Sequence, residues 1–343
     1  MTARALIASS YTAPVWLPGG NLQTIYAALC VARTKVEYRR ERWDTPDGDF
    51  VDVDWLDGAA GAPLVVLFHG LEGSSHSHYA LALMAEVRAL GWSGAVYHFR
   101  GCSGENNRLP RVYHSGDSAE IDWALRRLRL TRAGRPLLAV GVSLGGNALL
   151  KWLGEEGEAA TAIVDAAASV SAPLDLSATG YSLERGFNMV YTRMFLTTLK
   201  KKMFDKLTDY PDLVDVAATR RARTLYDFDN AVTAPLHGFR DTDDYWTRAS
   251  AKPWLQHIAL PTLVLNAQND PFMPASALPL PDEVSAQVLL EFPQTGGHVS
   301  FIAGPFPGNL RWLPQRVIAF LADAAAIRIS DVADEALVAP GAA

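Results

Sequence analysis

The chain has 343 residues, of which 49% are hydrophobic and 20% are charged, so it has enough apolar material for a large globular core. A formal net charge of -6 argues against a nucleic-acid-binding surface, because phosphate binding needs clustered positive charge. The two cysteines, Cys30 and Cys102, indicate neither a disulfide framework nor a zinc site. We therefore expect no nucleic-acid partner and no bound metal.

The N-terminal region contains no apolar stretch of signal-peptide length, because Pro14, Pro18 and the pair Gly19-Gly20 interrupt it. We expect neither a secretory signal nor a membrane-spanning helix. The sequence therefore favours a cytoplasmic protein, and it leaves peripheral membrane contact and the oligomeric state open.

Residues 1–34 are expected to form an irregular N-terminal extension that packs on the core. Residues 35–43 and 50–55 have the pattern of two strands, joined by a Thr-Pro-Asp-Gly turn at 45–48. The first regular unit is thus predicted to be a hairpin.

A βαβ unit follows the hairpin. Apolar runs at 64–68 and 94–99 flank a helical pattern at 80–90, and this alternation predicts parallel strands. Residues 117–130 carry apolar side chains at helical spacing and predict the next helix.

The most informative segment is an apolar strand at 137–142 that leads into Gly-x-Ser-x-Gly. This order places Ser143 on a sharp strand-to-helix turn with its hydroxyl above the sheet. Gly141 and Gly145 flank the serine because a side chain at either position would collide in so tight a turn. The alternative is a buried turn serine without chemistry.

Residues 144–153 are predicted to form the helix after this turn, with Gly154 as its end. The N-terminus of that helix would bring free N–H groups and the positive end of the helix dipole beside Ser143.

The rest of the chain predicts an α/β protein with a mostly parallel central sheet, helices on both faces and an inserted helical cap. The core is expected to comprise residues 35–174 and 251–328. The remaining elements expected in the core are strands at 162–170, 262–265 and 287–292 and a last helix at 313–326. Outside the core we expect the cap at 175–250 and a mobile tail at 329–343.

A serine hydroxyl needs an imidazole to take its proton and an acid to orient that imidazole. Asp270 follows the strand at 262–265, and His298 lies in a glycine-rich loop after the strand at 287–292, so both come after Ser143 in the expected order. Asp175 is the main alternative acid, and Asp117 is expected to be a helix cap.

The other histidines fit the role of base less well. His76, His78 and His114 lie on loops between early strands, and His237 and His257 have no glycine-rich loop. His69 differs because it opens the segment His-Gly-Leu-Glu-Gly directly after the strand at 64–68.

That segment is the expected source of a second oxyanion donor. We assign the two donating backbone N–H groups to Leu71 and Leu144, with His69 and Gly70 supporting the loop. The alternative is an ordinary βα turn.

The expected cap contains methionines and aromatic residues near helical spacing. Met189, Tyr191, Met194 and Phe195 are candidates for an acyl-chain pocket, although such a stripe is more often the packing face of a helix. The lysines at 200–202 and 206 could contact anionic lipid, but a charged run is usually a solvated face.

A set of distinctive segments is spread along the chain: 18–25 (PGGNLQTI), 68–74 (FHGLEGS), 98–104 (HFRGCSG), 113–116 (YHSG), 141–147 (GVSLGGN), 237–241 (HGFRD) with 244–245 (DY), 269–273 (NDPFM) and 296–299 (GGHV). Together they resemble the YheT-like branch of the α/β-hydrolases, which includes bacterial hydrolases and eukaryotic abhydrolase-domain lipases and phospholipases. One departure is Trp246, where relatives often have a second tyrosine.

The resemblance implies that Ser143, Asp270 and His298 are nucleophile, acid and base. It implies a serine esterase acting on short- or medium-chain acyl esters without a cofactor, with lipase, phospholipase and thioesterase activities as alternatives. A binding module that keeps the fold without the chemistry is the alternative from another class.

Overall fold

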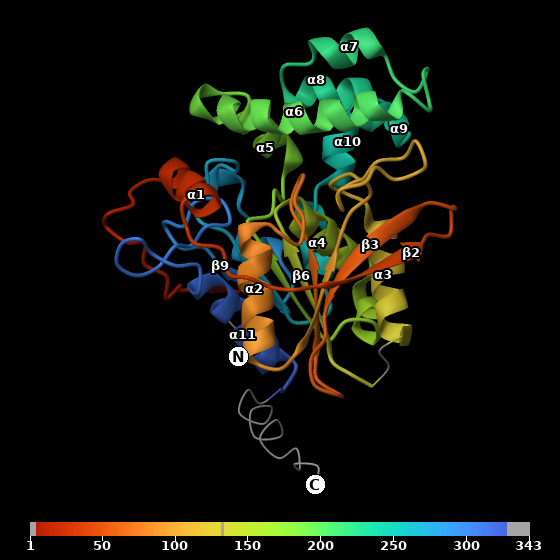
Figure 1. Cartoon of the computed structure of the whole chain (residues 1–343). Coiled ribbons are helices and arrows are strands. Elements are labelled where there is room, and N and C mark those ends of the chain that lie inside the picture. The colour runs from red at the N-terminus through yellow and green to blue at the C-terminus, as the bar shows by residue number, and fades with distance from the viewer. Residues whose placement is uncertain (1–4, 132–133, 328–343) are drawn as a thin grey trace.

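A single mixed sheet organises the part of the chain that this computed structural model describes, residues 5–131 and 134–327 (Figure 1). Within those residues the sheet has nine strands in the order β1-β9-β8-β7-β6-β4-β5-β3-β2. The tail expected at 329–343 lies outside the described residues. The strands are β1 (Leu6–Ile7), β2 (Arg39–Asp44), β3 (Phe50–Leu56), β4 (Leu64–Phe68), β5 (Ser93–Tyr97), β6 (Leu137–Val142), β7 (Ala166–Val170), β8 (Thr262–Leu265) and β9 (Val288–Glu291).

Neighbouring strands in the series β1-β9-β8-β7-β6-β4-β5 pair in parallel. The remaining two pairs, β5 with β3 and β3 with β2, are antiparallel. The predicted Thr-Pro-Asp-Gly turn joins β2 to β3, with Thr45 and Asp49 closing it by a backbone hydrogen bond. The α/β class and the mostly parallel sheet are confirmed.

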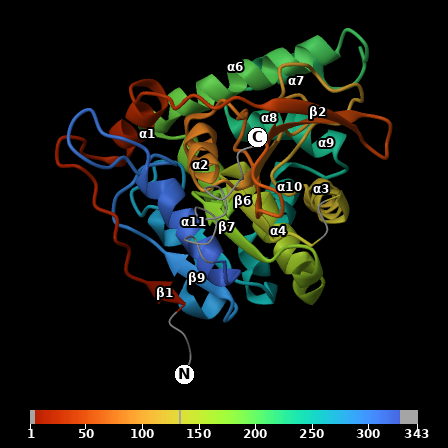
Figure 2. The same ribbon diagram turned by 60° about the horizontal axis from the view of Figure 1, so that its bottom comes forward.

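Helices cover both faces of the sheet because its central strands are apolar on both sides. In β4, Val65 and Leu67 pack on one face, while Leu64, Val66 and Phe68 pack on the other. Helices α2 and α11 lie over the first face and α3 and α4 over the second (Figure 2). Their bounds are α2 (His78–Ala89), α3 (Ser118–Thr131), α4 (Leu144–Glu156) and α11 (Trp312–Ala324).

A group of short and long helices lies above the carboxyl ends of the strands (Figure 1). It comprises α5 (Leu176–Leu183), α6 (Met189–Lys206), α7 (Val216–Arg221), α8 (Leu225–Phe228), a π-helical turn (Asp229–Thr233), α9 (Ala234–Leu236) and α10 (Thr242–Ala249).

The N-terminal region is more regular than the sequence analysis expected. β1 adds to the edge of the sheet beside β9, and α1 (Gly20–Leu29) follows it. The sequence did not predict them because a two-residue strand and a helix without a side-chain N-cap have few local sequence features that mark them. Both elements depend on tertiary contacts.

Two expected strands are shorter than predicted. β2 begins at Arg39, opposite Trp55, because β3 ends one residue beyond Trp55 and offers 35–38 no partner. The segment Gly157–Ala162 forms a 3-10 helix, so β7 starts only at Ala166.

The expected helix end at Gly154 is wrong. α4 continues to Glu156, and Gly157, at φ +52°, is the residue at its C-terminal end. Gly154 is needed for another reason: a Cβ there would lie 2.3 Å from the carbonyl oxygen of Trp254. The glycine thus allows α4 to approach the 3-10 segment Lys252–His257 closely.

We expect Gly154→Ala to lower the free energy of unfolding by about 1–3 kcal/mol, because the new methyl group overpacks a backbone contact. Helix propensity alone predicts the opposite sign, a gain of about 1 kcal/mol. Urea unfolding followed by tryptophan fluorescence measures the difference, and a stabilised variant would contradict the packing explanation.

Candidate active site

Ser143 lies on the turn between β6 and α4 in the strained conformation that such a turn requires. Its φ is +51°, and its N–H donates to the carbonyl of Val170 over 2.8 Å. A Cβ on Gly145 would lie 2.3 Å from the carbonyl oxygen of Phe68, and one on Gly141 would lie 2.5 Å from that of Gly145. Only glycine fits at these two positions.

The structure brings Ser143, His298 and Asp270 together. The Nε2 atom of His298 lies 3.0 Å from Oγ of Ser143, and Nδ1 lies 2.8 Å from Oδ2 of Asp270. An ionised carboxylate only accepts hydrogen bonds, so the proton of neutral His298 is on Nδ1 and Nε2 is free to accept from the serine.

The acid and the imidazole are both held in place. Oδ1 of Asp270 accepts the N–H of Phe272 over 2.8 Å, and the Phe272 ring stacks on His298 at a centroid distance of 4.0 Å. The Asp270 side chain is 1% exposed and that of His298 is 12% exposed, so bulk water competes little with their contact.

Helix α1 supports both loops through residues to which the sequence analysis gave no role. Oε1 of Gln23 accepts from the N–H of Gly296 and from Asn269, and Oγ1 of Thr24 accepts the N–H of His298 over 2.8 Å. The only signal for them in the sequence was the segment 18–25 that resembles the hydrolase family.

The other two aspartates considered, Asp175 and Asp117, interact with groups other than His298. The Asp175 side chain caps α5 by accepting the N–H of Ala178, and Asp117, expected to be a cap, forms an ion pair with Arg111. Neither carboxylate contacts His298 among the hydrogen bonds of the described residues.

The rival histidines also have other surroundings. His78 contacts the carbonyl of Val299 from the start of α2, and burial lowers its pKa to about 4. The ring centroids of His114 and His237 lie 4.4 Å apart. Burial lowers the pKa of His237 to about 3, so it is neutral at pH 7.

His69 supports its own loop. Its Nδ1 donates to the carbonyl of Gly70 over 2.7 Å, and its Nε2 accepts the N–H of Phe99. Burial lowers the pKa of His69 to about 3, which keeps the ring neutral as this pattern requires.

Leu71 and Leu144 were the expected oxyanion donors. Both residues line the same cavity as Ser143 and His298. Within the described part of the chain, the N–H groups of Leu71 and Leu144 have no hydrogen-bond acceptor. Both groups are therefore available to a ligand.

A largely apolar cavity extends from Ser143 to the helices above it. The apolar side chains of these helices that line it are Leu176, Leu183, Phe195, Leu199, Met203, Leu225, Phe228, Val232 and Trp246.

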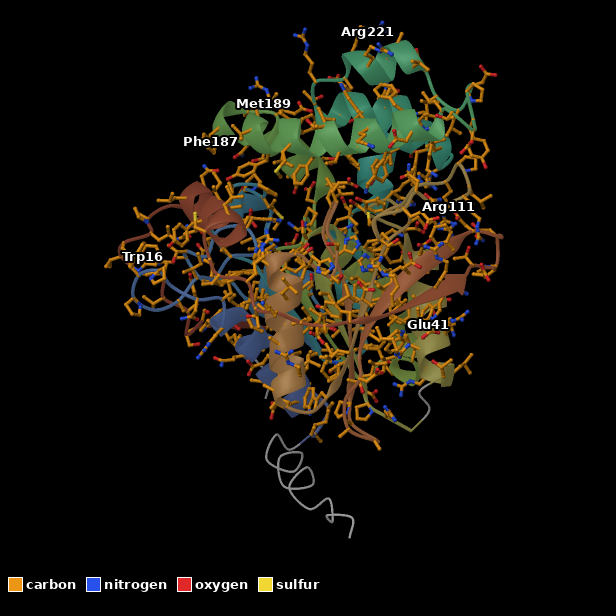
Figure 3. The ribbon with its side chains drawn as sticks, viewed as in Figure 1. Trp16, Glu41, Arg111, Phe187, Met189 and Arg221 are labelled. Atoms are coloured by element: carbon orange, nitrogen blue, oxygen red, sulfur yellow. The ribbon has the colours of Figure 1, made fainter. Side chains whose placement is uncertain are left out.

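The four expected acyl-pocket residues divide between different surroundings. Phe195 lines the cavity, but Tyr191 packs beside Phe272, Met194 is 57% exposed, and Met189 borders a separate surface hollow. Figure 3 shows Met189 near Phe187 at the start of α6. The face of α6 towards the cavity carries Phe195, Leu199 and Met203, which recur every four residues. The assignment of Met189, Tyr191 and Met194 to the pocket is thereby corrected.

Asp229 contributes a carboxyl group to the cavity wall. Asp229 accepts hydrogen bonds from the indole N–H of Trp246 and the hydroxyl of Thr233. Burial raises the pKa of Asp229 to about 6, although both hydrogen bonds act in the opposite direction. Trp246, the departure from the family pattern, therefore takes part in the cavity wall.

The described residues contain no cluster of three or more His, Cys, Asp or Glu side chains placed to hold a metal ion, and Cys30 and Cys102 are free thiols. None of the helices in residues 5–131 and 134–327 has the length and apolarity needed to cross a bilayer.

The sheet and the site define a hydrolase of the α/β class, and the comparisons agree. Residues 63–305 match the family model described as alpha/beta hydrolase fold, so the chain belongs to the α/β-hydrolase family. The chain is 42% identical over 302 residues to the Escherichia coli (strain K12) protein named "Putative esterase YheT", covering 87% of this chain and 88% of that protein. The YheT-like resemblance is confirmed.

Other relatives carry lipid-related names. Human phospholipase ABHD3 is 30% identical, with 88% of this chain and 76% of that protein covered. Yeast monoacylglycerol lipase is 27% identical, with coverages of 82% and 63%. The protein is thus a hydrolase of the esterase and lipase type.

Solved structures agree on the fold alone. The Pyrococcus furiosus esterase Pf2001 superposes with a TM-score of 0.55 at 14% identity, covering 84% of this chain and 91% of that chain. Est1E from Butyrivibrio proteoclasticus gives 0.54 at 13%, covering 85% and 100%.

The raised pKa of Asp229 predicts a pH-dependent stability. The pKa of Asp229 is near 6 in the folded state and 3.8 as the ordinary value. The contribution of Asp229 to the free energy of unfolding is therefore complete below about pH 4 and is lost as the pH rises through 6. Relative to Asp229→Asn, the wild-type free energy of unfolding should fall by about 2 kcal/mol between pH 4 and pH 7. Urea unfolding at several pH values checks this, and a difference independent of pH would contradict it.

Proposed function

We propose that the protein is a serine carboxylic-ester hydrolase that cleaves short- to medium-chain acyl esters through an acyl-enzyme. The observation that carries the proposal is the continuous hydrogen-bonded series from Ser143 through His298 to Asp270 beneath an apolar cavity. Ser143 is the nucleophile, His298 the general base and acid, and Asp270 the residue that orients the imidazole.

In the first step Oγ of Ser143 attacks the ester carbonyl while Nε2 of His298 takes the hydroxyl proton. The carbonyl oxygen becomes an oxyanion, which accepts hydrogen bonds from the N–H groups of Leu71 and Leu144. His298 then gives its proton to the leaving alcohol, and the acyl group remains on Ser143.

In the second step a water molecule takes the place of the alcohol. Nε2 of His298 removes a proton from this water, the resulting hydroxide attacks the acyl-enzyme, and the imidazolium returns the proton to Ser143. No cofactor takes part in either step.

The cavity favours an acyl group over a polar substituent. Most of the side chains that α6 and the following helices contribute to its walls are aliphatic or aromatic, so an alkyl chain placed there leaves water for a largely apolar surface.

Hydrolysis of lipid acyl esters is a second candidate. Human phospholipase ABHD3 and yeast monoacylglycerol lipase are relatives with such names, and the apolar cavity is compatible with a lipid acyl chain. The same nucleophile and base would serve a thioester, so the leaving group is the variable among these reactions.

Ser143→Ala should abolish labelling by a fluorophosphonate probe and lower the rate of p-nitrophenyl acetate hydrolysis by about 10⁴-fold or more, because the attacking oxygen is removed. Ser103→Ala is the matched control, since Ser103 lies in the loop after β5, donates to Asp52 of β3 and should be dispensable for labelling. Equal labelling of the Ser143 variant and the wild type would refute the assignment of Ser143, whereas a wild-type protein that is not labelled would favour a non-catalytic binding module.

Asp270→Asn and Asp175→Asn distinguish the two candidate acids. We expect the first substitution to lower kcat by about 10³- to 10⁴-fold, because an amide can present the wrong hydrogen-bonding partner to Nδ1 of His298. The second should leave kcat within about threefold and change stability little, because the amide oxygen of Asn can accept the same N–H and Asn caps helices about as well as Asp. Steady-state kinetics and thermal unfolding measure both, and a larger loss of kcat at Asp175 would reverse the assignment.

A further inference from the structure

The loop after β4 contains three consecutive backbone N–H groups that differ in their hydrogen bonding. The N–H of Gly70 donates to the hydroxyl of Tyr79 over 2.8 Å, and the N–H of Glu72 donates to the hydroxyl of Tyr113 over 2.8 Å. The N–H of Leu71, between them, has no acceptor among the described residues. Two side-chain hydroxyls thus hold the peptides on either side of the group available to a ligand.

Glu72 has a backbone conformation that needs external support. Its φ is +56°, in the left-handed region that side chains other than glycine rarely adopt. Its carboxylate is 9% exposed, and Oε1 accepts a hydrogen bond from the hydroxyl of Tyr113 over 2.8 Å. The same tyrosine therefore binds Glu72 through both the main chain and the side chain.

The tyrosine itself is fixed by the core. Tyr113 is buried, and its ring stacks on Phe99 at a centroid distance of 5.4 Å and an interplanar angle of 10°. Packing against the core thus helps to fix the position of the hydroxyl that binds Glu72.

A cap helix reaches the same carboxylate. Nζ of Lys202, on α6, lies 2.8 Å from Oε1 of Glu72 and 3.4 Å from Sγ of Cys102. The Lys202 side chain is 28% exposed and lines the cavity that contains Ser143. The charges of Glu72 and Lys202 meet in a largely desolvated place, where an ion pair is stronger than on the surface.

We propose that Glu72 and Lys202 are positioning residues, which hold the Leu71 N–H in the orientation that an oxyanion requires and join that donor to the cap. This inference rests on the proposed function, because the oxyanion forms only if Ser143 attacks a carbonyl. Lys202 and the apolar wall residues Leu199 and Met203 belong to the same helix, so an acyl chain that packs on α6 also fixes the oxyanion donor.

The test uses Lys202→Met in the full chain, with Lys201→Met as the matched control. Lys201 lies next to Lys202 on α6, but its side chain is 75% exposed and pairs with Asp205. We expect Lys202→Met to lower kcat for p-nitrophenyl butyrate about tenfold or more with KM within about threefold, because an oxyanion donor acts in the transition state. Lys201→Met should keep both constants.

A second measurement separates positioning from general structural support. Binding of an alkylboronic acid, whose adduct with Ser143 places an oxygen at the oxyanion position, should weaken in Lys202→Met by about the same factor as kcat. Lys202→Arg should restore most of both, because arginine keeps the charge and can donate to Glu72. Glu72→Gln, which removes the ion pair from the other side, should reproduce the effect and replaces Lys202→Met if that variant does not fold.

The outcomes are distinct. Wild-type kcat and boronate affinity in both Lys202→Met and Glu72→Gln, with Ser143 still labelled by fluorophosphonate, would overturn the positioning role and leave the proposed function intact. A wild-type protein whose Ser143 is not labelled would overturn the proposed function and this inference with it.

Discussion

The site depends on a close approach between main-chain segments at the carboxyl edge of the sheet. The turn at Ser143 packs so tightly against the end of β4 that a Cβ on Gly145 would lie 2.3 Å from the carbonyl oxygen of Phe68. This contact brings the first residues of α4 next to the loop that contains Leu71. As a result, the hydroxyl of Ser143 and two N–H groups that have no acceptor among the described residues lie around one small volume, and the backbone is ordered before any ligand arrives.

The partners of Ser143 reach it from loops, which need support because they have no regular hydrogen-bonding pattern of their own. Helix α1 supplies that support from the other end of the chain, through Gln23 and Thr24. Gly20, where a Cβ would lie 1.9 Å from the carbonyl oxygen of Asn269, brings the helix directly against the loop of Asp270. The N-terminal region is therefore a structural part of the site, and the imidazole of His298 is held in position by contacts beyond those with Ser143 and Asp270.

The helices above the sheet combine an apolar wall with a polar contact to the loop below. Phe195, Leu199 and Met203 of α6 face the cavity, while Lys202 on the same helix meets Glu72. The apolar wall excludes water and lowers the local dielectric constant, which strengthens hydrogen bonds to a developing negative charge. Differences in substrate between hydrolases of this fold can thus arise in the cap while the chemistry below stays the same.

The sequence by itself determined the order of the main strands and helices, the α/β class, and the position of Ser143 on a turn between β6 and α4. These follow from local patterns: apolar runs, helical spacing and glycines beside a serine. It also placed Asp270 and His298 on loops after late strands, but it left Asp175 open as the acid. Both aspartates follow a strand, so local pattern cannot tell them apart.

Only the tertiary structure decided which carboxylate meets His298, because that contact depends on how loops far apart in the chain are folded together. It also decided that α1 supports the loops of Asp270 and His298, that α4 continues through Gly154, and that Leu199 and Met203 face the cavity instead of Met189 and Met194. Periodicity reports that a helix has an apolar face, whereas the neighbour that covers that face is set by packing between segments distant in sequence.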